Sequence, residues 1–199
     1  MLEDLYEGGS PVDAQQRFTV LWQAHHGAVL RYARRRTDAE SAADVVSETF
    51  LIAWRRLGDI PADPEQTLPW LYGVARRVLC NLERSRARGD RLSARLAHTG
   101  RGAGPEADVA DGVAERERLV AALSQLPGRD REVLRLIGWE HLGLGQAAAV
   151  MGCSRASLAV RLHRARRRLE RALDASDDPH DDLDDTAMAR GERPLSIGR

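Results

Sequence analysis

The segment Gly145–Leu169, GQAAAVMGCSRASLAVRLHRARRRL, decides the fold. It predicts a short helix, a tight turn at Gly152 and a long second helix rich in arginine. When the second helix is drawn at about 100° per residue, its apolar and basic side chains occupy different arcs. An arginine run alone is also typical of a solvated helix face. The glycine turn and the preceding small-residue helix favour a helix-turn-helix, whose second helix lies in the DNA major groove. The apolar arc holds Leu158, Leu162, Ala165, Leu169 and Leu173, and the basic arc holds Arg161, Arg164, Arg167, Arg168 and Arg171.

Charge is unevenly distributed along the chain, although the formal net charge is zero. Residues 119–173 contain ten arginines against four acidic residues, whereas residues 174–199 contain eight acidic residues against three arginines. This segregation indicates a nucleic-acid face with either a separate electronegative partner surface or a tail that shields the basic face. The chain has no lysine. Bidentate contacts to phosphate and guanine are one explanation, but the high alanine content favours genome base composition as the cause.

Composition excludes several classes of protein. At 199 residues the chain can hold one or two small domains. Cys80 and Cys153 are far apart and belong to no Cys/His cluster, so we expect free thiols and no metal. No signal peptide or long apolar run is visible, so we expect a cytoplasmic protein without a membrane span. We find no nucleophile–base pair and no phosphate-cradling glycine loop, so we expect no enzyme and no catalytic residue.

Helical periodicity runs through the first part of the chain. After a flexible lead-in over residues 1–12, we expect a first domain over residues 13–96. Its first two helices are expected to end near His25 and near Arg36, so that His25 lies at a helix junction. Thr37 and Glu40 have the spacing of a capping box at the start of the next helix. A longer helix is expected from about Thr67 to Arg88.

The second part of the chain is expected to form a separate helical unit. Residues 97–112 are rich in glycine, alanine and polar residues without hydrophobic period, which is typical of a flexible linker between independently moving domains. The domain over residues 113–174 carries the helix-turn-helix, which is winged-helix-like without the wing. Residues 175–199 are expected to be a disordered acidic tail. The predicted fold class is therefore all-α, with two small helical domains joined by a flexible linker.

Three groups of residues, in chain order, carry a resemblance to a known family. Residues 44–54, DVVSETFLIAW, resemble a helix that docks on the β′ clamp of RNA polymerase. Residues 69–78, PWLYGVARRV, resemble a helix that meets the −10 promoter element. Residues 123–127, 131–134 and 161–166 resemble parts of a domain that reads the −35 element. Over residues 14–95 and 115–173 the chain thus resembles a bacterial RNA polymerase sigma factor of the extracytoplasmic-function type.

The resemblance implies a promoter-specificity subunit that has no catalytic group and needs no cofactor. Its implied partners are core RNA polymerase, through the β′ clamp and the β flap, promoter DNA, and an anti-sigma factor. The implied polymerase-binding residues are Asp44, Ser47, Glu48, Phe50 and Trp54. For the −10 element the implied residues are Trp70, Tyr72, Arg76, Arg77, Asn81 and Arg84, and for the −35 element they are Arg155, Ser157, Ala159, Arg161, Arg164 and Arg168.

The residues themselves leave some of these roles open. Trp70 and Tyr72 can stack on bases, although a tryptophan at a helix start more often belongs to the core. Arg155 begins the recognition helix, where base edges are met, while Arg161, Arg164 and Arg168 are better placed for phosphate.

The chain also departs from the family's usual pattern in the helix-turn-helix. Gln146-Ala147-Ala148 stands where the family usually has an acidic residue, a large aliphatic residue and alanine. Ala156-Ser157-Leu158 replaces the usual Gly-Thr-Val, and Val160 replaces a usual serine. Two other classes of function therefore stay open: a helix-turn-helix regulator that binds DNA without polymerase, and a sigma-like protein that sequesters a partner. The helix that resembles a clamp-docking helix argues against the first.

Overall fold

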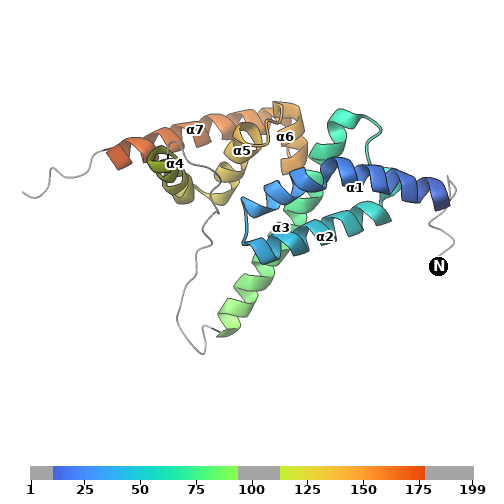
Figure 1. Cartoon of the computed structure of the whole chain (residues 1–199). Helices are drawn as coiled ribbons and strands as arrows, with labels where there is room; N and C mark the ends of the chain where they lie inside the picture. Colours follow the sequence, from blue (N-terminus) through green and yellow to red (C-terminus); the bar gives the residue numbers. More distant parts are fainter. Residues whose placement is uncertain (1–10, 94–112, 178–199) are drawn as a thin grey trace, which may run out of the picture.

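The computed structural model describes residues 11–93 and 113–177, and every regular element in these ranges is helical (Figure 1). The predicted all-α fold with a helix-turn-helix in its second half is confirmed. The expected lead-in up to residue 10, the linker over residues 97–112 and the tail beyond Asp177 lie outside the described residues. The first half comprises α1 (Pro11–Arg34), α2 (Ala39–Arg55), the 3-10 helix η2 (Leu57–Asp59) and α3 (Pro64–Ser93), and the second half comprises α4 (Val113–Gln125), α5 (Gly128–Gly138), α6 (Leu144–Met151) and α7 (Arg155–Asp177).

One continuous helix, α1, replaces the two short helices expected up to Arg36, and that expectation is wrong. His25 and His26 lie inside this helix instead of at a junction. The apolar stripe continues through them, because Leu21 before them and Val29 after them are both buried. The His26 ring also packs on Trp22, with ring centroids 4.4 Å apart, which helps to keep the helix regular.

The start of α2 is set by Asp38 and not by the capping box expected at Thr37. The Asp38 carboxylate accepts a hydrogen bond from the Ser41 backbone N–H at 2.9 Å, as an N-cap residue does. Thr37 is buried, and its hydroxyl donates to the Asp38 carboxylate at 3.2 Å. The hydrogen bonds from Ser41 and from Arg86 hold the pKa of Asp38 well below its usual range.

Helix α3 begins three residues before the expected Thr67 and contains Pro69 in its second turn. Proline has no N–H, so the Glu65 carbonyl, four residues earlier, lacks its usual helical donor. The side-chain amide of Gln146, from the other half of the chain, donates to this carbonyl at 3.0 Å. The gap that Pro69 leaves in α3 is therefore filled by a residue of α6.

The predicted helix-turn-helix consists of α6, a turn at Gly152, and α7. Gly152 has a φ of +64°, a left-handed conformation that glycine adopts without a steric penalty. The Cys153 N–H closes the turn by donating to the Ala148 carbonyl at 3.0 Å. The Ser154 hydroxyl then accepts from the Ser157 N–H at 3.1 Å at the start of α7. Leu158 and Ala165 are fully buried, which confirms the apolar face of α7.

The two halves pack against each other, in an arrangement that we call the closed arrangement (Figure 1). The main contact is between α3 and α6. At the crossing, a Cβ added to Gly73 would lie 3.9 Å from the Val150 Cα, so the two backbones run close together. Buried apolar residues of both halves form one continuous core cluster. The sequence predicts two domains that move independently, and no local pattern in it indicates this contact.

Candidate DNA-binding and polymerase-binding surfaces

The first turn and a half of α7 presents the residues expected to read bases. Arg155, Ser157 and Ala159 are all exposed. Arg155 is the first residue of the helix, and the Ser154 hydroxyl lies 2.9 Å from that of Ser157. The amino-terminal end of the second helix is the part of a helix-turn-helix that reaches base edges. These three side chains are therefore available for that contact.

Farther along α7, two of the arginines expected to bind phosphate are engaged within the protein. Asp130, in the first turn of α5, is only 4% exposed. Its carboxylate forms an ion pair with Arg168 and lies 3.8 Å from the Arg161 guanidinium. These contacts tie α7 to α5, so Arg161 and Arg168 support the fold. Arg164, by contrast, is exposed on α7.

The acidic face of α2 borders a groove between α2 and α3. The groove has a volume of about 370 Å³. Asp44, Ser47 and Glu48 are exposed along its rim, one turn apart on the same side of α2. Its remaining lining is apolar and comes from Val45 and Leu51 of α2 and from Val78 and Leu82 of α3. An apolar floor with an acidic rim is suited to a partner helix that carries both apolar and basic side chains.

Phe50, which the resemblance assigns to polymerase binding, does not belong to this surface. Its side chain is 1% exposed, because α2 turns it into the core against Phe18 and Trp22. Trp54 is 40% exposed and meets the Phe18 ring edge-on with centroids 5.2 Å apart. Of the two aromatic residues, only Trp54 has surface to offer to a partner.

The residues expected at the −10 element divide between the surface and the contact between the halves. Arg77, Asn81 and Arg84 are exposed on α3, and the Arg84 guanidinium donates to the Asn81 side-chain oxygen at 3.0 Å. Arg76 and Trp70 are half-buried.

Tyr72 is 3% exposed and stacks on Tyr32 with ring centroids 4.6 Å apart. Burial raises the pKa of the Tyr72 phenol to about 12. In the closed arrangement this ring is therefore covered, and its expected stacking on DNA bases is blocked.

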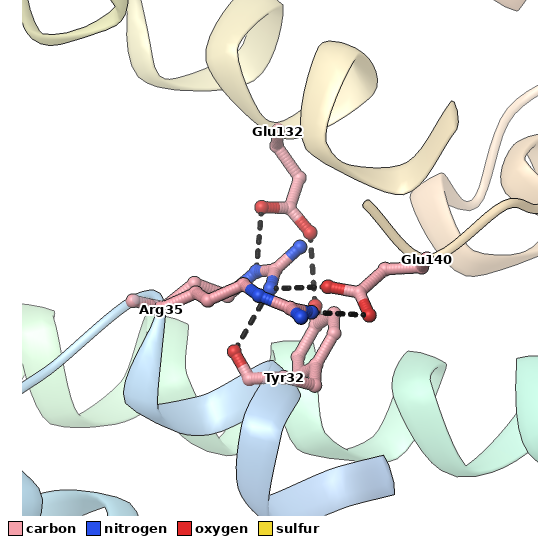
Figure 2. A network of polar contacts seen from close by, with 5 residues as sticks. Tyr32, Arg35, Glu132 and Glu140 are labelled. Atoms are coloured by element: carbon pink, nitrogen blue, oxygen red, sulfur yellow. Dashed lines mark hydrogen bonds and ion pairs between the residues drawn. The ribbon is translucent and has the colours of Figure 1, made fainter. Parts of the chain in front are cut away.

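A buried ion-pair network joins the end of α1 to α5 and the turn after it (Figure 2). Arg36 lies 2.9 Å from Glu132 and 3.0 Å from Glu140, and the three side chains are only 6%, 13% and 3% exposed. Arg35 also contacts Glu140 at 3.0 Å, and the Tyr32 hydroxyl donates to Glu132 at 2.9 Å. Residues about 100 positions apart in the chain thus form one polar cluster.

The Arg36 guanidinium is held charged in this cluster. Burial alone lowers its pKa, but Tyr32 and the carboxylates of Glu132 and Glu140 outweigh that effect, so the pKa lies above its ordinary value. The guanidinium carbon also lies 3.5 Å above the Tyr32 ring centroid, in a cation–π contact. Sequence reasoning missed this network, because no local pattern marks partners so far apart along the chain.

The second half contains a helix-turn-helix whose second helix has an exposed amino-terminal end. The first half contains a groove with an acidic rim and an apolar floor. Together these features are typical of a DNA-binding protein that also docks on another protein. Comparisons with known families agree with this class. Residues 21–89 match Sigma-70 region 2, and residues 116–169 match Sigma-70, region 4.

Individual relatives give the same result. The chain is 30% identical over 154 residues to the ECF RNA polymerase sigma factor SigL of Mycobacterium tuberculosis, covering 77% of this chain and 86% of that protein. It is 32% identical over 169 residues to the RNA polymerase sigma factor CnrH of Cupriavidus metallidurans, covering 76% of this chain and 84% of the relative. The chain therefore belongs to the extracytoplasmic-function type of the sigma-70 family.

As a member of this family, it is a sigma factor, a non-enzymatic subunit that directs RNA polymerase to promoters and supports transcription initiation. Solved structures share the fold. CnrH in complex with the cytosolic domain of CnrY has a TM-score of 0.55 at 27% identity, covering 81% of this chain and 95% of that one. The sigma factor RpoE in complex with the anti-sigma factor NepR, from Bartonella quintana, has a TM-score of 0.59 at 23% identity, covering 81% and 97%. Within residues 11–93 and 113–177, no helix has the length and apolar character needed to cross a membrane.

Proposed function

We propose that the α2–α3 groove is the surface by which this sigma factor docks on core polymerase. The observation that carries the proposal is the combination of exposed Asp44, Ser47 and Glu48 with an apolar floor. The acidic rim steers a basic partner helix, and the apolar floor supplies burial once the helix is seated. In line with the family resemblance, the partner is the β′ clamp, and the second half contacts the β flap. Such a protein acts in the cytoplasm, where the polymerase works.

On the DNA side, α3 supplies the contacts to the −10 element and the start of α7 supplies those to the −35 element. Exposed Arg77 and Arg84 suit backbone phosphates, and Asn81 is able to hydrogen-bond a base edge. Arg155 is the base reader of α7, with Ser157 and Ala159 beside it, and Arg164 binds backbone phosphate. Trp70 and Tyr72 contribute to −10 recognition only after the two halves separate, since α3 is packed against α6 in the closed arrangement.

The closed arrangement is thus the resting form of the free chain, and promoter recognition requires it to open. Three kinds of contact hold it: the Arg36 ion pairs, the Tyr32–Glu132 hydrogen bond and the Gln146–Glu65 hydrogen bond. An anti-sigma factor would act on the same equilibrium between the closed and the open arrangement. CnrH was solved with the cytosolic domain of CnrY, and we extend this kind of partner to the present chain. Such a partner should compete with core polymerase for the chain in a binding assay.

In vitro transcription separates the candidate functions. The purified chain is mixed with bacterial core polymerase and genomic DNA templates, and transcript start sites are mapped. A sigma factor gives promoter-selective transcripts only when both components are present. A helix-turn-helix regulator would bind its site without core, and a sequestering protein would bind polymerase or another partner without giving any transcript.

A further inference from the structure

A pocket of about 490 Å³ lies between the two halves, apart from the α2–α3 groove and the start of α7, and it shares Arg76 and Arg84 with the residues expected at the −10 element. The first half contributes the end of α1 and the middle of α3, and the second half contributes the start and middle of α5. The pocket therefore exists only in the closed arrangement. Its basic lining residues are Arg36, Arg76, Arg84, Arg129, Arg131 and Arg135.

The charge in this pocket is unbalanced. Its six guanidinium groups face two carboxylates, those of Glu83 and Glu132. The carboxylate of Glu132 is already bound to Arg36 and to the Tyr32 hydroxyl. Burial, followed by the charges of Arg36 and Arg131, lowers the pKa of Arg135 to about 10. The lining thus carries an excess of positive charge in a partly desolvated place.

Two donors of this lining also lack a partner. Arg36 Nη2 and Arg131 Nε are buried, and neither makes a hydrogen bond within the described residues. Arg36 is the stronger observation, because its side chain is only 6% exposed. Buried donors without a partner are costly in a folded protein, and a bound ligand or water is the usual explanation. Here both donors belong to residues that line the same pocket.

We propose that this pocket binds a small phosphate-bearing molecule, whose phosphate oxygens accept hydrogen bonds from the Arg36, Arg131 and Arg135 guanidinium groups. Phosphate matches the planar, charged donors of arginine, and a pocket of this volume has the size of a small-ligand site. The start of α5, at Gly128 and Arg129, adds the positive end of a helix dipole.

Because both halves build the pocket, a ligand bound there stabilises the closed arrangement and opposes promoter recognition by mass action. This consequence rests on the proposal that the closed arrangement is the resting form. The binding step itself is independent of transcription. It can therefore be tested on the free chain without polymerase.

Cys80 lines the pocket and serves as a built-in reporter. With Cys153→Ala as background, Cys80 is the only thiol of the chain. The measurement is the rate of its alkylation by uncharged N-ethylmaleimide, with sodium pyrophosphate, inorganic phosphate or ATP as probe and sodium chloride as the control at matched ionic strength. We expect pyrophosphate to slow alkylation with saturation. Stronger protection by ATP would assign the ligand to nucleotides, and equal protection would assign it to the phosphate group alone.

Variants place the binding in this pocket. Arg135→Gln and Arg131→Gln should each raise the half-saturating concentration of pyrophosphate about tenfold, the factor typical for one charge-assisted hydrogen bond. Arg34→Gln, an exposed arginine near the end of the same α1, should leave it unchanged. Thermal unfolding followed by circular dichroism checks that each variant folds, and Arg135→Gln suffices if Arg131→Gln does not. The proposal is wrong if protection does not saturate, if chloride reproduces it, if Arg135→Gln matches Arg34→Gln, or if a single-stranded oligonucleotide protects Cys80 better than ATP.

Discussion

The Gln146 side chain donates to the Glu65 carbonyl at 3.0 Å and accepts from the Gly143 N–H at 2.9 Å. One amide group thus caps α6 and at the same time completes the hydrogen bonding that Pro69 interrupts in α3. A carboxylate at this position could only accept. The family's usual acidic residue would therefore keep the cap of α6 and lose the bond to α3, so the glutamine gives this chain an additional tie between its halves.

The variant Gln146→Glu tests whether the hydrogen bond from Gln146 to Glu65 helps to hold the halves together. The α6 cap should survive, because a carboxylate still accepts from Gly143, whereas the bond to Glu65 is replaced by repulsion between two oxygens. We expect the population of open chains to rise, which small-angle X-ray scattering detects as a larger radius of gyration. Gln23→Glu, the same exchange at an exposed position of α1, should cause no such change. An unchanged radius in Gln146→Glu would show that the hydrogen bond does not help to hold the halves together.

Removal of Arg36 should open the closed arrangement without unfolding either half. Breaking a buried ion pair by truncating one partner typically costs about 3–5 kcal/mol. Here the halves can separate and return Glu132 and Glu140 to water, so the loss appears as opening. Arg36→Ala should increase the radius of gyration and keep the helical circular dichroism signal, while Arg34→Ala should leave both unchanged. Loss of helical signal in Arg36→Ala would mean that the network stabilises the first half itself.

The Tyr72 phenol reports closure through its ionisation. Its pKa is raised from 10 to about 12 by burial and then by the charge of Glu140 from the second half, so the neutral form is favoured in the closed arrangement. The contribution of this ring is therefore complete below pH 10 and is lost as the pH rises from 10 towards 12. The difference in absorbance at about 295 nm between wild type and Tyr72→Phe should titrate near pH 12. The same difference measured in an Arg36→Ala background should titrate closer to pH 10, and identical curves would contradict opening.

The sequence predicted much of the fold and of the exposed surface, because these depend on local pattern. The apolar arc of α7, the turn at Gly152 and the acidic face of α2 all follow from spacing within one or two helical turns. The polymerase-binding role of Phe50 came from the family resemblance and not from helical spacing, and the side chain lies in the core. The sequence predicts a helix junction at His25, although the apolar stripe of α1 runs through this position. Contacts between distant residues, such as Arg36 with Glu132, leave no local signal.

Charge reversal in the α2 groove should weaken binding to core polymerase. Asp44→Arg combined with Glu48→Arg replaces the acidic rim by a basic one, and we expect affinity for core to fall at least tenfold with little change in helicity. Glu40→Arg is the matched control, since Glu40 lies exposed on the same helix but outside the groove. Equal losses in both variants would indicate a general effect of charge. Unchanged co-purification of the double variant with core would disprove the docking assignment.

The variants Arg155→Ala and Arg164→Ala distinguish base recognition from phosphate binding at the −35 element. Loss of a base contact by Arg155 should cost about 1–3 kcal/mol on the preferred sequence and little on a scrambled one. Loss of a phosphate contact by Arg164 should weaken both and reduce the salt slope by about one unit. Arg168→Ala is less informative, because it also leaves buried Asp130 without its ion pair. Both templates are compared across a salt series, and equal weakening by Arg155→Ala would reassign base reading to Ser157 or Ala159.

The pairing of Asp130 with Arg161 and Arg168 limits how this protein can acquire a new promoter preference. Substitutions in the middle and later turns of α7 disturb the ion pairs that join it to α5. The permissible changes therefore concentrate at Arg155, Ser157 and Ala159. A library built to redirect the protein to a different −35 sequence should vary these three positions and keep Asp130, Arg161 and Arg168. Selected variants should then differ in the promoters that they use and retain the unfolding temperature of the parent.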